Sequence, residues 1–585
     1  MTLKKYNAID IETEGLDIDD AINFIGIHTY DNDDDPGEYH ILQPGVDNLD
    51  ILEELKDPNK INIFHNGKFD TKMMQHQLNQ KIPMTHDTML LAYLCSTAPE
   101  LIENRGKWLS LKSCAMRLLG VDNWDVELSK KTSHSREEVE EYLKKDLYYT
   151  RLIYQVLRDT INKEELKTYS LMLKATEVYT QVELNGLPIN IEQLEDVKGE
   201  FEECLLDIDL QLKAYADINW NSPKQLQDLL YNKLQLPIPM YTNTGQPGTG
   251  IEALTKLKGK HTIVDLILKR REYDKALTFL KDWKDREKNG RLYANFNLHT
   301  TVTGRTSCNG PNLQQIPRNK KLKTLFQSTD PDWELVQLDY SQMELRTAAI
   351  VAGVQAMKDA YNKGEDLHTN MAAIVSGKPR EEVTKPERTR AKAANFGYLY
   401  GMQPATFVQY AKIGYGVDMS LEEATRIRNS FFEANYELHK YYKDTQDDLL
   451  SHGYVTSIMG RRYKVGFKHL SFPDQRSLYM RKILNFPVQS AASDWALCAL
   501  YEIYKTFSQD EVKICATVHD SIIMEVKKNN NFSNNIKKIQ SIMQSPKLAK
   551  NYITKTVDLP IVADIEIGPW GIGVGLEEYE GVENG

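Results

Sequence analysis

The sequence predicts a multi-domain protein in which a compact α/β unit precedes a helical region and a mixed α+β region. With 585 residues the chain exceeds what one hydrophobic core usually supports, so three or four units are expected. Strand-like runs come first, and helical periods follow up to about residue 165. From about 166 to 290 the sequence is helical and polar, and from 291 to 585 strand-like and helix-like stretches alternate.

Composition is typical of a soluble protein, with 41% hydrophobic and 26% charged residues. No run of about 18 apolar residues could span a bilayer, and acidic residues follow the first residues too soon for a signal peptide. We therefore expect a cytoplasmic protein with no membrane partner.

The six cysteines form no CxxC pair and have no histidines at zinc spacing, so reduced thiols are expected. A net charge of −11 does not exclude a nucleic-acid enzyme, which needs only a local cationic groove.

The N-terminal unit begins with strand-like runs at Tyr6 to Glu12, at "INFIGIHTY" and at Ile61 to Asn66. A long helical period follows Ser135, which can serve as its N-cap. In the helical region, "NSPKQLQDLLYNKL" carries a cap and a proline in the first turn, and "YTNTGQPGTG" reads as a loop. The basic clusters "KLKGKH" and "LKRREYDK" are either solvated helix faces or a surface that follows phosphates.

Two strand-like runs of the C-terminal region each end in an aspartate, Asp339 in "ELVQLDYSQMELR" and Asp520 in "KICATVHDSIIMEV". A carboxylate removed from water needs a cation nearby. If the two ends adjoin, they could share Mg²⁺, which prefers carboxylates together with substrate phosphates. Taken singly, each aspartate is better explained as a turn or cap residue. Glu344 also has a structural alternative, because "SQME" has the spacing of a capping box with Ser341 as N-cap.

A further helix is predicted in "TKPERTRAKAANFGYLYG", with Thr384 and Glu387 as a capping box and Gly401 as the stop. Helical spacing aligns Arg388, Lys392, Phe396 and Tyr400 in one stripe, cationic at its start and aromatic at its end. Such a stripe suits a nucleotide, with phosphates on the cations and base or sugar on the rings. Gly397 weakens the helix interior, which indicates a close approach to its backbone.

A second acidic set lies near the N-terminus, with Asp10 and Glu12 in "DIET", Asn66 and Asp70 in "NGKFD", and Tyr142 and Asp146 in "YLKKD". Tyr142 and Asp146 are four residues apart on a predicted helix and share a face. Four acids and a tyrosine could hold two metal ions about 4 Å apart for in-line attack on a phosphodiester. The D-x-E triplet alone is weak support.

Together these tracts resemble a known family. "TGRTSCNGPNLQQIPR", "DYSQMELR", "RTRAKAANFGYLYG", "RKILNFPVQSAASD" and "VHDSIIMEV" resemble, in order, the signature tracts of family A DNA polymerases, and the second acidic set resembles the three motifs of their 3′ to 5′ proofreading exonuclease. The resemblance implies a ribonuclease H-like α/β exonuclease domain at 1–165 and an α+β right-hand polymerase domain at 166–585. Within the latter it implies a thumb at about 181–290, a palm at about 291–346 and 480–585, and fingers at about 347–479.

The resemblance also implies roles for single residues. Asp339, Asp520 and the backbone carbonyl of Tyr340 would be metal ligands of the polymerase site. The incoming nucleotide would meet Arg388, Lys392, Phe396, Tyr400, Glu344, Gln342 and His519, with Lys392 also catalytic and Glu344 as the steric gate against a ribose 2′-hydroxyl. Primer and template would meet Arg305, Gln314, Arg481, Asn485 and Gln489. In the exonuclease, Asp10, Glu12, Asp70 and Asp146 would hold metal, Tyr142 would position the attacking water, and Asn66 would support the site.

The implied cofactors are two Mg²⁺ ions at each site, which Mn²⁺ could replace. The implied partners are primer-template DNA, deoxynucleoside triphosphates and replisome proteins such as a helicase-primase or single-strand binding protein. The chain departs from the family pattern at Ser521, where many members have a second acid, and at Met480 and Ser490, which replace Glu and Gly. The early exonuclease motif leaves no room for a 5′ nuclease domain, and the thumb tip is short. We expect a compact replicative polymerase of bacteriophage type.

Other functions stay open. The chain could be a DEDD-type exonuclease with an inactive polymerase half that only holds DNA, although both palm aspartates and the stripe are present. A nucleotide-driven motor is disfavoured, because no GxxxxGK[ST] loop occurs. Reverse transcription is a weaker third possibility.

Overall fold

The computed structural model describes residues 3–104, 107–124 and 135–583. Its N-terminal unit is built on a five-stranded sheet of order β3-β2-β1-β4-β5. β1 pairs antiparallel with β2 and parallel with β4, so the sheet is mixed. The strands are β1 (Tyr6–Thr13), β2 (Ile22–Tyr30), β3 (Glu38–Leu42), β4 (Ile61–Phe64) and β5 (His86–Asp87). The predicted strands are confirmed.

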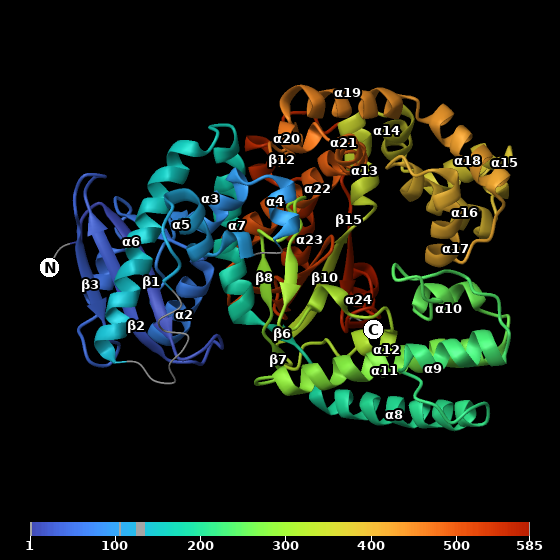
Figure 1. The fold of residues 1–585 in the computed structure, drawn as a ribbon, viewed down its shortest axis with the longest axis horizontal. Helices are drawn as coiled ribbons and strands as arrows, with labels where there is room; N and C mark the ends of the chain where they lie inside the picture. The colour runs from blue at the N-terminus through green and yellow to red at the C-terminus, as the bar shows by residue number, and fades with distance from the viewer. Residues whose placement is uncertain (1–2, 105–106, 125–134, 584–585) are drawn as a thin grey trace.

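Helices lie against this sheet (Figure 1). The long helix α6 (Arg136–Thr160) packs against β1, β2 and β4, and its predicted N-cap is confirmed, since Ser135 and Glu138 form a reciprocal capping box. The other helices of the unit are α1 (Ile51–Glu54), α2 (Lys68–Leu78), α3 (Thr88–Cys95), α4 (Ala98–Glu103), a 3₁₀ turn at Lys107–Leu109 and α5 (Leu111–Leu119).

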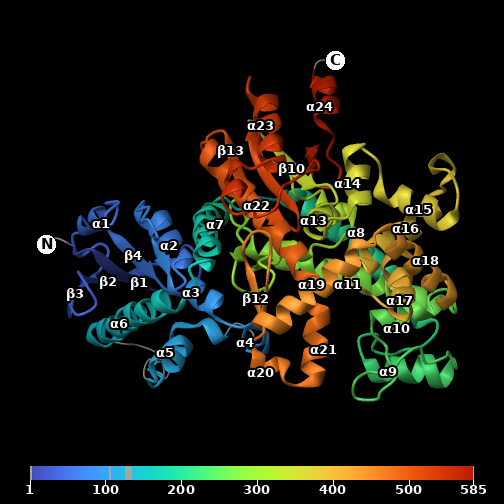
Figure 2. The same cartoon turned by 90° about the horizontal axis from the view of Figure 1, so that it is seen from above.

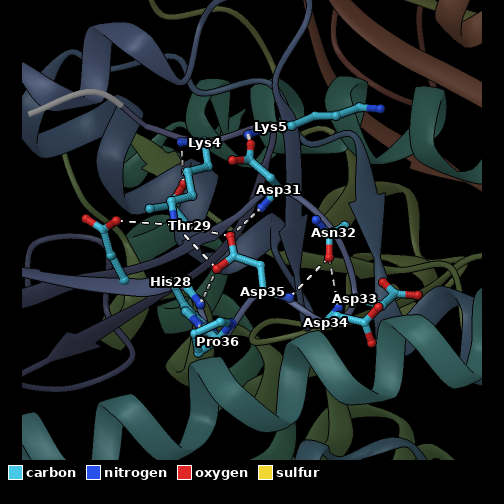
Figure 3. A network of polar contacts seen from close by, with 12 residues as sticks. Lys4, Lys5, His28, Thr29, Asp31, Asn32, Asp33, Asp34, Asp35 and Pro36 are labelled. Carbon is cyan, nitrogen blue, oxygen red and sulfur yellow. Dashed lines mark hydrogen bonds and ion pairs between the residues drawn. The ribbon is translucent and has the colours of Figure 1, made fainter.

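The acidic turn between β2 and β3 is organised by its own side chains (Figure 3). The carboxylate of Asp35 accepts hydrogen bonds from the backbone N–H groups of Asp31 and Gly37 and forms an ion pair with Lys4. From α6, the buried Arg151 guanidinium donates to the backbone carbonyls of Asp33 and Asp35 at 2.8 and 2.6 Å. These contacts organise the turn and connect it to α6.

Helix α7 (Glu165–Asn185) joins the N-terminal unit to the rest of the molecule, and Figure 2 shows it between the two. Its buried residues lie in one continuous hydrophobic core that also includes side chains of α3, of α6 and of the C-terminal sheet. Glu183 of α7 is buried and pairs with Lys68 and Lys72 of α2, the latter at 2.9 Å. The two parts are therefore joined by both apolar packing and buried ion pairs.

A helical arm follows, with a small core of its own. It consists of α8 (Ile191–Lys213), α9 (Pro223–Gln227), a π-helical segment at Asp228–Lys233, α10 (Ile251–Leu257) and α11 (Thr262–Arg286). Ser222 caps α9 and Pro223 stands in its first turn, as predicted. The sequence pattern did not predict the change to π-helical hydrogen bonding after Gln227.

The C-terminal region is centred on a four-stranded antiparallel sheet of order β13-β14-β10-β15. Its strands are β10 (Trp333–Tyr340), β13 (Val512–Val518), β14 (Ser521–Lys527) and β15 (Ala563–Ile567). The apolar helices α13 (Met343–Ala352) and α22 (Phe486–Thr506) pack against each other. Antiparallel pairing of β10 with β14 places the end of β10 next to the β13-β14 turn.

A second group of helices extends from the central sheet on the side opposite to α8–α11 (Figure 1). Its members are α14 (Gln355–Asn362), α15 (Leu367–Ser376), α16 (Lys385–Tyr398), α17 (Pro404–Tyr415), α18 (Leu421–Ala434), α19 (Glu437–His452), α20 (Phe467–Leu470) and α21 (Pro473–Lys482). The remaining elements are β6 (Leu187–Pro188), β7 (Arg291–Leu292), β8 (Asn295–Asn297), β9 (Ser307–Asn309), α12 (Lys320–Lys323), β11 (Tyr454–Thr456), β12 (Arg462–Lys464), α23 (Phe532–Gln544), α24 (Leu576–Glu583) and 3₁₀ turns at Leu313–Gln315, Arg380–Glu382 and Lys547–Asn551.

Two expectations from composition can be compared with the fold. All six cysteines are free thiols, as predicted. Among the described residues, no helix combines the length and apolar character that a membrane span requires.

Candidate functional sites

The two strand-end aspartates of the C-terminal region lie side by side. Asp339 is the penultimate residue of β10 and stands opposite Ser521 in the β10-β14 register. Asp520 occupies the turn between β13 and β14, and its carbonyl accepts a hydrogen bond from the Tyr340 backbone at 3.3 Å. Antiparallel pairing thus brings together two carboxylates that are far apart in the sequence.

Neither aspartate is enclosed in the core as the sequence suggested. The Asp339 side chain reaches solvent and Asp520 is half-buried, because both lie at the open end of the sheet. Partial burial of its carboxyl group nevertheless raises the pKa of Asp339 to about 6, and repulsion from Asp520, Asp564 and Glu566 raises it further. Burial likewise raises the pKa of Asp520. Such a pair of mutually repelling carboxylates is suited to binding a cation.

Several residues predicted to contact DNA or nucleotide surround a hollow of about 60 Å³ next to Asp520. Arg305, Gln314 and His519 line it together with Asp520. The Gln314 amide donates to Thr306 Oγ1 at 3.1 Å, which fixes its orientation. His519 adopts a left-handed backbone conformation with φ of 56°, so its exposed side chain stands at the tip of the turn.

Glu344 is held by residues from two other elements. Its carboxylate accepts a hydrogen bond from the Tyr400 hydroxyl at 2.7 Å and forms an ion pair with Arg305. The predicted capping box at Ser341 is wrong. Gln342, with φ of 54°, is the N-cap of α13 and makes no side-chain capping bond. The Gln342 side chain instead accepts a hydrogen bond from the Tyr361 hydroxyl at 3.1 Å.

The stripe of cationic and aromatic residues lies on α16 and just beyond it. The capping box of Thr384 and Glu387 is confirmed, but the helix ends at Tyr398, so Tyr400 follows the last turn. Arg388 and Lys392 are exposed, and Arg388 pairs with Asp366 at 2.8 Å. Phe396 is half-buried, and its ring centroid lies 5.9 Å from that of His368.

The close approach expected at Gly397 comes from protein. A Cβ atom there would lie 2.8 Å from the Phe407 ring of α17. Gly397 is therefore required for packing of α16 on α17, and a ligand is not needed to explain it.

The remaining predicted DNA contacts follow one another along α21 and α22. Arg481 is exposed in the last turn of α21, Asn485 is the N-cap of α22, and Gln489 lies one turn further on. Asn485 Oδ1 is buried and has no hydrogen-bond partner among the residues that the structure describes. A buried amide oxygen without a partner costs free energy, and a ligand donor could offset that cost.

The second acidic set forms a cluster on the N-terminal sheet. Asp10 and Glu12 project from β1, and Asp146 lies on α6, which crosses that strand. Ligand atoms of these three acids lie within 4.8 Å of one another, which fits the spacing around a metal ion. Asp70 of α2 joins them, because its Oδ1 accepts a hydrogen bond from the Ile11 backbone at 3.1 Å, between the other two acids of β1.

Burial and mutual repulsion raise the pKa values in this cluster. Asp10 is raised well above its usual value, first by burial and then by Asp70, Asp146 and Glu12. Burial also raises the pKa of Asp70. A divalent cation would relieve this repulsion, so the set satisfies the chemical requirement for a metal site.

Sequence reasoning missed three residues at this cluster. Asp87 accepts hydrogen bonds from the backbone N–H groups of Asn66 and Gly67 and so fixes the turn that begins α2. Asn66 itself has an exposed side chain and a left-handed backbone φ of 61° in this turn, so its support of the site stays a prediction. Lys112 and Trp124 both contact Asp146. No motif marks these three residues, because they come from separate segments that only folding brings together.

Comparisons with known proteins identify the families that the two parts of the chain resemble. Residues 191–571, more than half of the chain, match the family model of DNA polymerase family A, and residues 2–162 match that of a 3′-5′ exonuclease. DNA polymerase I of Aquifex aeolicus is 29% identical over 95% of this chain and 94% of its own length. DNA polymerase I of Bacillus subtilis is 28% identical over 75% of this chain but only 50% of its own length.

A solved structure shows the same fold. The polymerase domain of Pol1 from M. smegmatis, in complex with DNA primer-template and dNTP, superposes with a TM-score of 0.82 at 23% sequence identity. The match covers 96% of this chain and 95% of that chain. The arrangement of an N-terminal exonuclease domain followed by a right-hand polymerase domain is thereby confirmed.

Proposed function

Because the chain belongs to DNA polymerase family A and carries a 3′-5′ exonuclease domain, we propose that it copies a DNA template by two-metal nucleotidyl transfer and proofreads the 3′ end. The adjacency of Asp339 and Asp520 carries the proposal for synthesis. The cluster of Asp10, Glu12 and Asp146 carries the proposal for proofreading.

In the polymerase site, Asp339, Asp520 and the Tyr340 carbonyl would hold two Mg²⁺ ions, which Mn²⁺ could replace. When bound, these ions would activate the primer 3′-hydroxyl and neutralise the leaving pyrophosphate. The raised pKa of Asp339 supports this role, because burial and the neighbouring carboxylates disfavour its charged form and a bound cation would stabilise it. Ser521 is buried and donates to the Val518 carbonyl at 2.9 Å, so the turn is held without a further acid there.

The nucleotide would enter between α16 and the strand ends. Arg388 and Lys392, both exposed, would bind the triphosphate, and Phe396 would face the sugar. Binding of phosphate by Arg388 would compete with its ion pair to Asp366. Glu344, fixed by Tyr400 and Arg305, would exclude the ribose 2′-hydroxyl.

Primer and template would lie along Arg305, Gln314, Arg481, Asn485 and Gln489. Asn485 Oδ1, buried and without a partner among the described residues, supports this path, because a hydrogen-bond donor of DNA would satisfy it. On this proposal α8–α11 form the thumb, at about 181–290, the palm spans about 291–346 and 480–585, and the fingers span about 347–479.

In the exonuclease site, Asp10, Glu12, Asp70 and Asp146 would hold two further ions, and Tyr142 would orient the attacking water. Replisome proteins such as a helicase-primase or a single-strand binding protein, a cytoplasmic location and a role in phage genome replication stay predictions. The relatives named above are bacterial enzymes, so they do not support the phage assignment.

A primer-template assay tests the proposal. Wild-type protein should lengthen the primer with the four deoxynucleotides and shorten it without them. Asp339→Ala and Asp520→Ala should abolish lengthening and keep shortening, while Asp10→Ala should do the reverse. Extension by Asp339→Ala at the wild-type rate would contradict the assignment of the palm site. Shortening by the wild type under all conditions would favour the alternative, a DEDD-type exonuclease whose polymerase half only holds DNA.

A further inference from the structure

A lysine lies inside the acidic cluster of the exonuclease domain. Lys112 is the second residue of α5, and its Nζ lies 2.6 Å from Asp146 Oδ2 and 2.7 Å from the Tyr142 hydroxyl oxygen. Its side chain is only 16% exposed. The ammonium group therefore links the two residues of α6 that face the cluster.

Aromatic rings hold this ammonium in place. Nζ lies 4.6 Å from the ring centroid of Tyr142 and 5.3 Å from that of Trp124. The Trp124 indole N–H also donates to Asp146 Oδ1 at 2.6 Å, so both carboxylate oxygens of Asp146 have a donor from the protein. An ordinary surface ion pair is flexible and solvated, whereas this one is enclosed and fixed by two rings.

The position of Lys112 bears on both metal binding and the tyrosine. Lys112 Nζ contacts Oδ2 of Asp146, one of the three acids whose ligand atoms lie within 4.8 Å of one another. The ammonium would therefore compete with a bound metal ion for the Asp146 carboxylate. The Tyr142 oxygen accepts a hydrogen bond from Lys112, and this contact restricts the directions in which the phenol O–H can point.

We propose that Lys112 is a positioning residue of the exonuclease site, which orients the Tyr142 hydroxyl and shares Asp146 with the metal ions. The proposal rests on the proposed exonuclease function. A lysine that positions Tyr142 should raise the rate of hydrolysis, and the same lysine should weaken metal binding by its positive charge. If Lys112 only supported the fold, its removal would lower both the rate of hydrolysis and the affinity for metal.

The test combines a rate with a binding measurement. Lys112→Met, Lys112→Arg and the matched control Arg117→Met, which removes another cation of α5, are compared with the parent protein. Degradation of single-stranded DNA is measured at saturating Mg²⁺. Mn²⁺ affinity is measured by titration calorimetry in an Asp339→Asn/Asp520→Asn background, which removes the palm ligands. Primer extension and thermal melting check the fold.

We expect Lys112→Met to slow degradation roughly ten- to hundredfold, the range found for residues that orient metal-site groups. Mn²⁺ should bind several-fold tighter to this variant. Lys112→Arg should keep more of the rate, and Arg117→Met should match the parent. An unchanged rate in Lys112→Met would overturn the proposal, as would a lower rate with unchanged or weaker Mn²⁺ binding, or an equal loss in Arg117→Met.

Failure of the exonuclease assignment would look different. In that case the wild type would not degrade DNA, or Asp10→Ala would degrade it as fast as the wild type. The Mn²⁺ titration would still report on Lys112, because it needs no turnover, and an affinity unchanged by Lys112→Met would then overturn its role at the cluster.

Discussion

The Tyr400 hydroxyl donates a hydrogen bond of 2.7 Å to Glu344, although 56 residues separate the two in the chain. Glu344 also pairs with Arg305, so one carboxylate joins α13, the segment after α16 and the loop that precedes β9. Burial and the neighbouring carboxylate raise the pKa of Tyr400 well above its usual range, so its hydroxyl stays a donor.

Replacing Glu344 should alter both sugar selection and the position of Tyr400. Glu344→Ala removes the carboxylate that would meet a 2′-hydroxyl, so the ratio of ribonucleotide to deoxynucleotide incorporation should rise by at least tenfold. Incorporation of each nucleotide in single-turnover primer extension measures this ratio. Glu365→Ala, which removes a half-buried loop carboxylate paired with Arg380, is the matched control. An unchanged ratio in Glu344→Ala would remove Glu344 from the sugar site.

Phe396→Tyr should relax rejection of dideoxynucleotides. Phe396 would face the sugar of the incoming nucleotide, and an added phenol hydroxyl could replace the missing 3′-hydroxyl as a polar group. Chain-termination ratios at fixed nucleotide concentrations measure the effect. Phe407→Tyr places the same hydroxyl in the buried α16-α17 contact and should not change the ratio. Equal ratios for Phe396→Tyr and wild type would count against this placement.

Asp339 should make metal-free stability depend on pH. Its pKa is raised from 3.8 to about 6 in the folded state, so the folded protein binds more protons than the unfolded chain between these values. Stability should therefore fall as pH rises from 3.8 to about 6, and Asp339→Asn should remove this loss. In EDTA, the thermal midpoint of Asp339→Asn should exceed that of wild type at pH 8, and the gap should close near pH 4.

A gap that stays constant across this pH range would contradict the raised pKa. The control is Asp332→Asn, an exposed carboxylate immediately before β10. It tests whether loss of any carboxylate near this strand has the same effect.

Glu183→Gln should weaken the junction between the two parts of the chain. The buried carboxylate accepts from Lys68, from Lys72 and from the Phe296 backbone at 2.7 Å. Its removal leaves two lysines without a counter-charge, and breaking buried pairs in this way typically costs about 3–5 kcal/mol. Denaturant titration should show this loss in unfolding free energy. Because α2 also carries Asp70, degradation of DNA should slow as well.

Glu177→Gln is the matched control on the same helix. Glu177 pairs with Lys505 at 2.6 Å near the surface, where such pairs contribute about 1 kcal/mol or less. Equal losses of unfolding free energy in the two variants would show that the stabilisation by Glu183 does not depend on its burial.

Local signals in the sequence predicted local structure well. The capping boxes at Ser135 and Thr384 form as expected, because each depends only on residues within one turn. At Ser341 the same signal failed, since the Ser341 backbone N–H donates to Val562 at 2.9 Å and continues the sheet pairing of β10 with the segment before β15. A long-range contact there overrides a local preference.

The residues of the candidate sites differed in how far the sequence alone could predict them. Two strand ends that each carried an unusual charge raised the possibility that Asp339 and Asp520 adjoin, and the family resemblance implied that they share a site. Lys112 could not be found this way, because a single lysine at the start of an ordinary helix carries no signal. Its meaning depends on Tyr142 and Asp146, which lie 30 and 34 residues further along the chain.

Helix α7 belongs to both halves of the molecule, because its apolar residues share one core with α3 and α6 on one side and with α22 and β13 on the other. A cut at residue 165 would therefore pass through packed side chains instead of a linker. Either half made alone would present a large apolar surface to water, which promotes aggregation. The N-terminal unit is thus not a removable module, and an exchange with a related unit would have to preserve the face that meets α7.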